Sequence, residues 1–140
     1  MTNKQAHKNL AMVVLVTCIS FIGMALPYPM LAPLFFTEPF FFKDSNLIFS
    51  KEVMYGITLA AYPFAQFFGS IYLGKISDQQ GRKKVLQISI LGASFGFLFS
   101  AITLYSQNLN FFILSRLLTG LFEGQIAIAR AIATDLSPQI

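Results

Sequence analysis

The chain has little charge, a single histidine, a single cysteine and no tryptophan. Charged residues make up only 11% of its 140 residues, whereas about 25% is usual in soluble domains. Hydrophobic residues make up 55%, and phenylalanine alone accounts for 16 positions. One small core cannot bury this much apolar surface, so a lipid bilayer is the expected solvent.

The scarcity of reactive side chains also excludes several kinds of chemistry. His7 lies in the polar N-terminal segment and Cys18 lies in an apolar run, so neither belongs to a catalytic pair, a disulfide framework or a metal site. No glycine-rich phosphate loop of the ATPase type occurs. We therefore expect no enzyme, no metal and no cofactor. The net charge of +4 does not indicate nucleic-acid binding, because the basic residues are scattered rather than gathered on one solvated face.

Four apolar segments dominate the sequence, and each reaches the roughly 20 residues that span the hydrocarbon core. We expect membrane helices over about residues 10–36, 53–76, 85–105 and 111–136. The first segment exceeds the roughly 7–15 apolar residues of a signal peptide. The predicted fold is therefore an all-α, multi-pass membrane protein with four transmembrane helices within residues 1–140.

Prolines and small residues indicate how these helices bend and pack. Pro27, Pro29 and Pro33 each remove a backbone donor near the end of the first helix. The helix either breaks there, against protein or a wet cavity, or ends at the membrane interface. Small residues at four-residue spacing predict close approach of helix backbones, and they occur as the pairs Gly92/Gly96 and Gly120/Gly124.

The basic residues near the helix ends predict the orientation in the membrane. If the N-terminus is cytoplasmic, six of them lie inside, namely Lys4, Lys8, Lys75, Arg82, Lys83 and Lys84. Only Lys43 and Lys51 then lie outside. Positive charge is retained on the cytoplasmic side, so we expect the N-terminus to be cytoplasmic.

Three charged residues fall inside the fourth apolar segment. Arg116, Glu123 and Arg130 follow one another at seven-residue steps, which places them on one stripe of a continuous helix. Facing lipid would cost about 2.5–3.5 kcal/mol for each charge. We expect the stripe to line a substrate or proton pathway, with Gln66 as a neutral polar partner. The alternative is that the two arginines extend to opposite interfaces and Glu123 is protonated.

A polar, basic segment, GKISDQQGRKKV over Gly74–Val85, separates the second and third apolar segments. Its spacing of Gly74, Asp78, Gly81, Arg82 and Lys83 resembles the signature loop between helices 2 and 3 of the major facilitator superfamily. Gln79 stands where that superfamily often has Arg or Lys, which removes one positive charge from the loop. The charges of this loop also suit a plain role in setting topology.

The fourth segment resembles the same superfamily at Arg116, Gly120 and Asp135. The resemblance implies that Asp78, Arg82 and Asp135 belong to a cytoplasmic gating cluster. This cluster closes against a helix of a second half, and Gly74 permits the close contact. The proline-rich end of the first segment, Gly23–Pro33, is similar to the first helix of drug:proton antiporters.

The resemblance implies that residues 1–140 are the N-terminal part of a major facilitator domain and supply four helices of its N-terminal six-helix bundle. It implies a secondary transporter of a small molecule, which works by alternating access. It also implies multidrug efflux, proton coupling and location in a bacterial inner (cell) membrane. Many proton-coupled relatives carry an acidic residue in the first helix; here that residue is absent, which leaves Glu123 as the deep carboxyl group. Transport is expected to need further C-terminal helices or another chain. The alternatives are a truncated membrane protein or anchor without transport activity, and uptake of a sugar or other metabolite.

Overall fold

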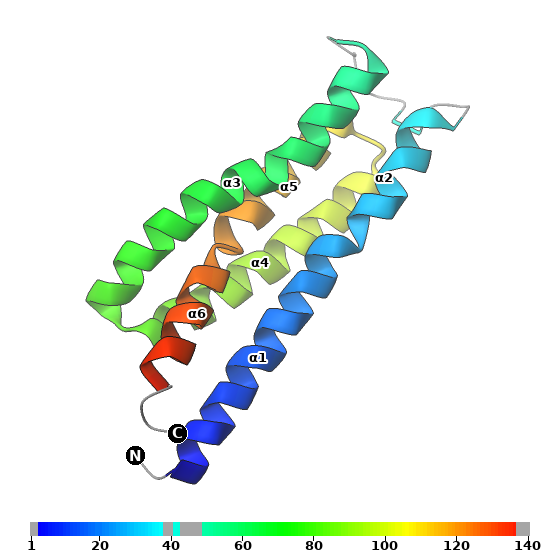
Figure 1. Cartoon of the computed structure of the whole chain (residues 1–140). Coiled ribbons are helices and arrows are strands. Elements are labelled where there is room, and N and C mark those ends of the chain that lie inside the picture. Colours follow the sequence, from blue (N-terminus) through cyan, green and yellow to red (C-terminus); the bar gives the residue numbers. More distant parts are fainter. Residues whose placement is uncertain (1–2, 38–40, 43–48, 137–140) are drawn as a thin grey trace.

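The computed structural model describes residues 3–37, 41–42 and 49–136, without the side chains of residues 3–6, 9, 125, 127, 130, 135 and 136. These parts of the chain are mainly helical (Figure 1). The helices are α1 (Asn3–Ala25), α2 (Pro27–Phe36), α3 (Lys51–Gln80), α4 (Arg82–Tyr105), α5 (Leu109–Phe122) and α6 (Gln125–Leu136).

The first apolar segment is interrupted at the proline cluster. α1 ends at Ala25, and after Leu26 the chain continues as α2, whose first residue is Pro27. Proline fits the first turn of a helix because its missing N–H has no partner to lose there. Figure 1 shows α1 and α2 following one another along one side of the bundle with a bend between them. The helix therefore breaks at the prolines and continues, which is the first of the two predicted outcomes.

The last apolar segment is also interrupted, which corrects the expectation of one helix over 111–136. α5 ends at Phe122, Glu123 caps it by donating its N–H to the Thr119 carbonyl at 3.0 Å, and α6 begins at Gln125. Glycine is a poor helix former, and Gly124 lies directly against the backbone of Gly69 on α3. The turn at Glu123–Gly124 divides the predicted stripe between two helices.

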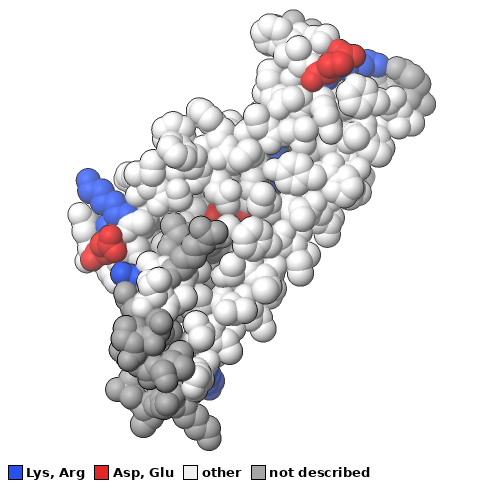
Figure 2. Space-filling view, viewed as in Figure 1, with Lys and Arg blue, Asp and Glu red and all other residues white. Residues whose placement is uncertain are grey.

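Two spans are long and apolar enough to cross a membrane by length and composition, Leu10–Phe36 and Arg82–Tyr105. α5 is apolar but shorter. The outer faces of α1 and α4 expose large apolar side chains, among them Leu15 and Ile22 on α1 and Phe95 on α4. In Figure 2 charged side chains gather at the two ends of the molecule, and a wide, almost uncharged band lies between them. This surface is suited to lipid.

α5 packs mainly against α3 and α4. A Cβ atom on Gly120 would overlap the carbonyl oxygen of Tyr62, and one on Gly69 would overlap the carbonyl oxygen of Leu121. On the other side, a Cβ atom on Gly92 would overlap the ring of Phe122. The predicted role of the small-residue pairs in close packing is therefore confirmed.

Apolar clusters hold the two ends of the bundle. At one end the buried side chains of Leu31, Phe35, Phe42, Met54, Leu109 and Phe112 pack together, and the Phe35 and Phe42 ring centres are 5.4 Å apart. At the other end Leu73, Val85 and Ile128 join α3, α4 and α6. Figure 1 shows that α1 begins and α6 ends at this second end, where α3 also turns into α4.

Candidate functional site

Arg116 is enclosed in the middle of the bundle, with only 1% of its surface exposed. Its guanidinium carbon lies 4.7 Å from the centre of the Tyr62 ring and 5.8 Å from that of Tyr28. Its Nε and Nη2 atoms are buried and make no hydrogen bond to the part of the chain that the structure describes. The aromatic faces therefore supply the contacts that stabilise this cation.

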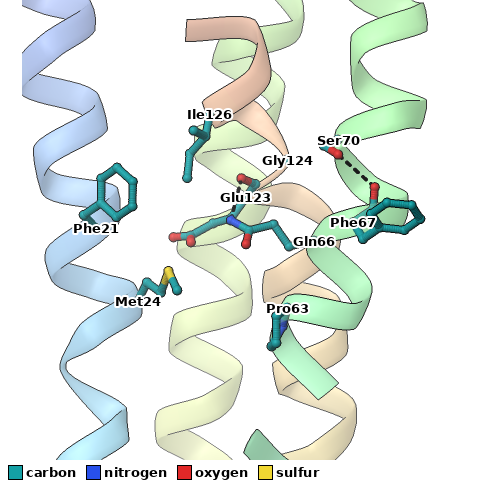
Figure 3. Close-up of a pocket in the computed structure, with 9 residues that line it drawn as sticks. All are labelled: Phe21, Met24, Pro63, Gln66, Phe67, Ser70, Glu123, Gly124 and Ile126. Atoms are coloured by element: carbon teal, nitrogen blue, oxygen red, sulfur yellow. Dashed lines mark hydrogen bonds between the residues drawn. The ribbon is translucent and has the colours of Figure 1, made fainter. Parts of the chain in front are cut away.

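Glu123 is equally buried at the turn between α5 and α6, and its Oε2 atom has no hydrogen-bond partner within the described ranges. Figure 3 shows its carboxylate extending toward α1, between Phe21 and Met24. Gln66 on α3 donates from Nε2 to the backbone carbonyl of Glu123 at 3.4 Å. Gln66 therefore bonds a backbone group at the helix interruption and leaves the carboxylate open.

Two cavities meet at Glu123. A cavity of about 430 Å³ lies between α1, α3 and the α5–α6 turn, and it is lined by Phe21, Met24, Pro63, Gln66, Phe67, Ser70, Glu123, Gly124 and Ile126 (Figure 3). A cavity of about 290 Å³ lies between α1 and α4, and Glu123 lines it together with Ser20, Ser94, Phe97 and aliphatic side chains. Among the described residues that line these two cavities, Glu123 is the one that carries a charge.

The other predicted pathway residues lie apart from this carboxylate. Arg116 is two turns before Glu123 on α5 and lines neither cavity. It faces a separate, mostly apolar cavity of about 180 Å³ beside Pro27, Met30 and Phe112. Arg130 lies on α6, and its side chain is outside the described residues. No group of three or more His, Cys, Asp or Glu residues suited to a metal ion occurs in the searched, described residues.

The joint between α3 and α4 contains the signature residues. Asp78 is exposed in the last turn of α3, Arg82 is half-buried at the start of α4, and Lys83 is exposed. Gly81 joins the two helices with a φ of +94° and donates its N–H to the Ser77 carbonyl at 3.0 Å. Residues other than glycine rarely adopt this backbone conformation, which explains glycine at this position.

Two further signature positions are Gly74 and Asp135. Gly74 is half-buried, and a Cβ atom added there would meet nothing within 4 Å. Asp135 lies near the end of α6, and its side chain is outside the described residues. The described joint therefore contains a sharp turn between Asp78 and Arg82 and an open helix face at Gly74.

Sequence reasoning missed the aromatic contacts of Arg116 and the role of Gly69. Tyr62 is four residues before Gln66, so the two share a face of α3, and that spacing is the signal that could have identified it. Ala65 lies four residues before Gly69, and this small-residue spacing is the signal that could have identified the packing of Gly69 against Leu121 and Gly124.

Comparison with known proteins connects this geometry to a family. The family model of the Major Facilitator Superfamily matches residues 13–139. The chain is 30% identical over 132 residues to the class H tetracycline resistance protein of Pasteurella multocida, which covers 94% of this chain and 30% of that protein. It is 31% identical over 122 residues to the class B protein of Escherichia coli, with coverage of 86% and 27%.

A eukaryotic relative is also similar. Major facilitator superfamily domain-containing protein 10 of Mus musculus is 30% identical over 81 residues, or 58% of this chain and 17% of that protein. The chain thus spans less than a third of the length of these relatives. No solved structure matches the chain. Because the family match includes both interrupted helical segments and the α3–α4 joint, this all-α membrane protein belongs to the major facilitator superfamily.

Proposed function

We propose that the chain provides the N-terminal helices of a secondary transporter that exports a small molecule by alternating access. The observation that carries this proposal is the cavity at the α5–α6 turn, where a buried carboxylate without a partner in the described chain faces open space. An intramembrane ionisable residue of this kind is a functional candidate by default, because burying it without a purpose is costly. The tetracycline resistance proteins among the relatives support drug efflux as the direction of transport.

Proton coupling is proposed to use Glu123. The first apolar segment contains no acidic residue. Among the described residues that line the cavity, Glu123 therefore provides the carboxyl group. A carboxyl group can alternate between its ionised and protonated forms as the cavity opens to each side. Arg116, Gln66 and Arg130 complete the proposed substrate and proton pathway.

Gating is proposed to act at the end of the bundle that contains the α3–α4 joint. In this proposal Gly74, Asp78, Gly81, Arg82, Lys83 and Asp135 form the half of a cytoplasmic gate that this chain supplies. The open face at Gly74 is suited to close approach by another helix. The excess of basic residues at this end supports a cytoplasmic N-terminus in a bacterial inner membrane.

The complete transporter is proposed to need more helices than this chain supplies. Transport sites of this type lie between repeats, and one bundle moves against another. The relatives are more than three times as long as the matched region. The alternative, a membrane protein that does not transport, predicts that added helices restore nothing.

The test compares the chain alone with a chimera that continues into the remainder of the class H relative. Everted bacterial vesicles carrying each form are energised with a proton gradient, and tetracycline uptake is measured. We expect the chimera to take up tetracycline and the 140-residue chain to take up none. Uptake by the chimera should be lost with Glu123→Gln. It should be retained with Glu52→Gln, which alters an exposed carboxylate outside the cavity. Equal uptake by the Glu123→Gln and parent chimeras would contradict the proposed pathway.

A further inference from the structure

We infer that the cavity of about 180 Å³ beside Arg116 binds a small monovalent anion such as chloride or nitrate. This site is separate from the two cavities at Glu123, and it goes beyond the proposed function because it requires no transport. The inference follows from the contacts that the buried guanidinium makes and from those that it lacks within the described chain.

The guanidinium group of Arg116 is enclosed but incompletely bonded. Only 1% of the residue's surface is exposed, and its Nε and Nη2 atoms donate no hydrogen bond to the described residues. The ring centres of Tyr62 and Tyr28 lie 4.7 and 5.8 Å from its central carbon. These rings attract the cation, but they carry no negative charge. A buried charge is normally paired with one of opposite sign, because its removal from water is costly.

The described side chains around the cavity supply no acidic partner. Those that line it come from α2, α4 and α5 and from Leu26, and Arg116 is the charged one among them. Glu123 lies two turns further along the chain, and its carboxylate extends toward α1 (Figure 3). The cavity is therefore a place where an anion meets unoccupied donors and an uncompensated positive charge.

The size and the walls of the cavity favour a small ion with a single charge. Its volume of about 180 Å³ is below the roughly 300–1,000 Å³ of pockets that hold drug-sized ligands. The walls are mainly apolar, and the Ser100 hydroxyl is already hydrogen-bonded to that of Ser115 at 2.8 Å. Few groups can thus replace the water around an ion, which penalises doubly charged sulfate more than chloride or nitrate. A cation would be repelled by Arg116.

The test measures the binding of radiolabelled chloride to the purified 140-residue chain in nanodiscs of zwitterionic lipid. Equilibrium dialysis in gluconate buffer is used, with empty nanodiscs as the blank. We expect saturable binding that nitrate displaces and that sulfate at the same ionic strength does not. Arg116→Met should weaken chloride binding by at least about tenfold, because the pairing charge is lost. The matched control Lys84→Met removes an exposed positive charge outside the cavity and should leave binding unchanged.

A second pair of variants keeps the test decisive if Arg116→Met alters the fold. Met30 lines the cavity and is 56% exposed, so its exchange removes little packing. Met30→Glu places a carboxylate at the cavity, where it competes with the ion for Arg116. Met30→Gln has the same shape without the charge. Chloride should bind Met30→Glu at least about tenfold more weakly than Met30→Gln.

A carboxylate on the further helices of a complete transporter is the other source of the same negative charge. The chimera with the class H relative distinguishes the two sources, because such a carboxylate would exclude chloride from the chimera but not from the chain alone. Saturable chloride binding by both forms supports the free ion.

Three results would overturn the inference. They are the absence of saturable binding, equal binding within either variant comparison, and binding that is confined to the chain alone. Tetracycline uptake by the chimera is measured separately. Uptake without chloride binding would therefore refute the anion site alone, and chloride binding without uptake would refute the transporter proposal alone.

Discussion

The Arg116 guanidinium carbon lies 4.7 Å from the centre of the Tyr62 ring, whose own hydroxyl oxygen is buried without a hydrogen bond to the described chain. The ring face, and not the hydroxyl, is therefore what Tyr62 offers to its neighbour. A buried hydroxyl without a partner costs stability, so the position combines a favourable cation–π contact with an unfavourable polar group.

Tyr62→Phe should therefore leave the free energy of unfolding unchanged or raise it by about 1 kcal/mol. Phenylalanine keeps the ring beneath Arg116 and removes the buried hydroxyl. Thermal unfolding of the detergent-solubilised chain measures the effect, with Tyr62→Ala as the variant that loses the ring and should unfold earlier. A clear loss of stability in Tyr62→Phe would mean that the hydroxyl has a partner in the membrane.

Arg116→Met should stabilise the chain by about 1 kcal/mol or more, because it replaces a buried, incompletely bonded cation with an apolar side chain of similar length. The same change should abolish uptake by the chimera if Arg116 lines the pathway. Unfolding and uptake are measured on the same preparations. Lys84→Met, at an exposed position, is the control and should leave stability unchanged.

Gly81→Ala should destabilise the chain by about 1–3 kcal/mol, because the φ of +94° is unfavourable for any residue with a Cβ atom. Gly74→Ala is the matched control, since its added methyl group enters open space within a helix. It should be neutral, or stabilising by up to about 1 kcal/mol. Equal melting temperatures for the two variants would show that the sharp turn at Gly81 is not formed in the membrane.

Gly120→Ala should separate α5 from α3, because the new methyl group would overlap the Tyr62 carbonyl oxygen. Overpacking of this kind costs about 1–3 kcal/mol. Gly56→Ala on α3 meets no atom within 4 Å and should not destabilise. Unfolding by denaturing detergent compares the two, and a stable Gly120→Ala variant would contradict the close contact.

Neutralising Arg82, Lys83 and Lys84 together should weaken insertion with the α3–α4 joint inside the cell, because basic residues near helix ends set orientation. Reporter fusions after residue 84 measure the cytoplasmic fraction. The control removes Lys51 instead, which lies at the opposite end of α3. A reporter that stays fully cytoplasmic would exclude these three charges as the determinant.

The helix interruptions show where sequence reasoning succeeds and where it fails. Proline removes a backbone donor and can therefore be recognised in the sequence as a site where a helix breaks or ends. A break near Pro27 is one of these two outcomes and is the one observed. The break at Glu123–Gly124 has no proline. It depends on contact between Gly124 and Gly69, more than fifty residues apart in the sequence, which local patterns cannot reveal.

The candidate site was predictable to a similar extent. Charge within an apolar segment identified Arg116 and Glu123, because water and lipid differ so strongly as solvents for charge. Gln66 was identified as a polar partner, but the partner group is the Glu123 carbonyl and not its carboxylate. That distinction requires the turn, which frees a carbonyl group that a continuous helix would have bonded.

The two interruptions divide the bundle mechanically. α1 and α6 contact one another, and each is joined to the rest of its span at a break, at Leu26 and at Glu123–Gly124. α3 and α4 are uninterrupted, and α5 is held between them by glycine contacts. α3, α4 and α5 thus form a frame of close backbone contacts, and α1 and α6 are the pair of helices that adjoin a break. Tilting this pair would widen or narrow the space in front of Glu123 while the backbone contacts within the frame stay intact.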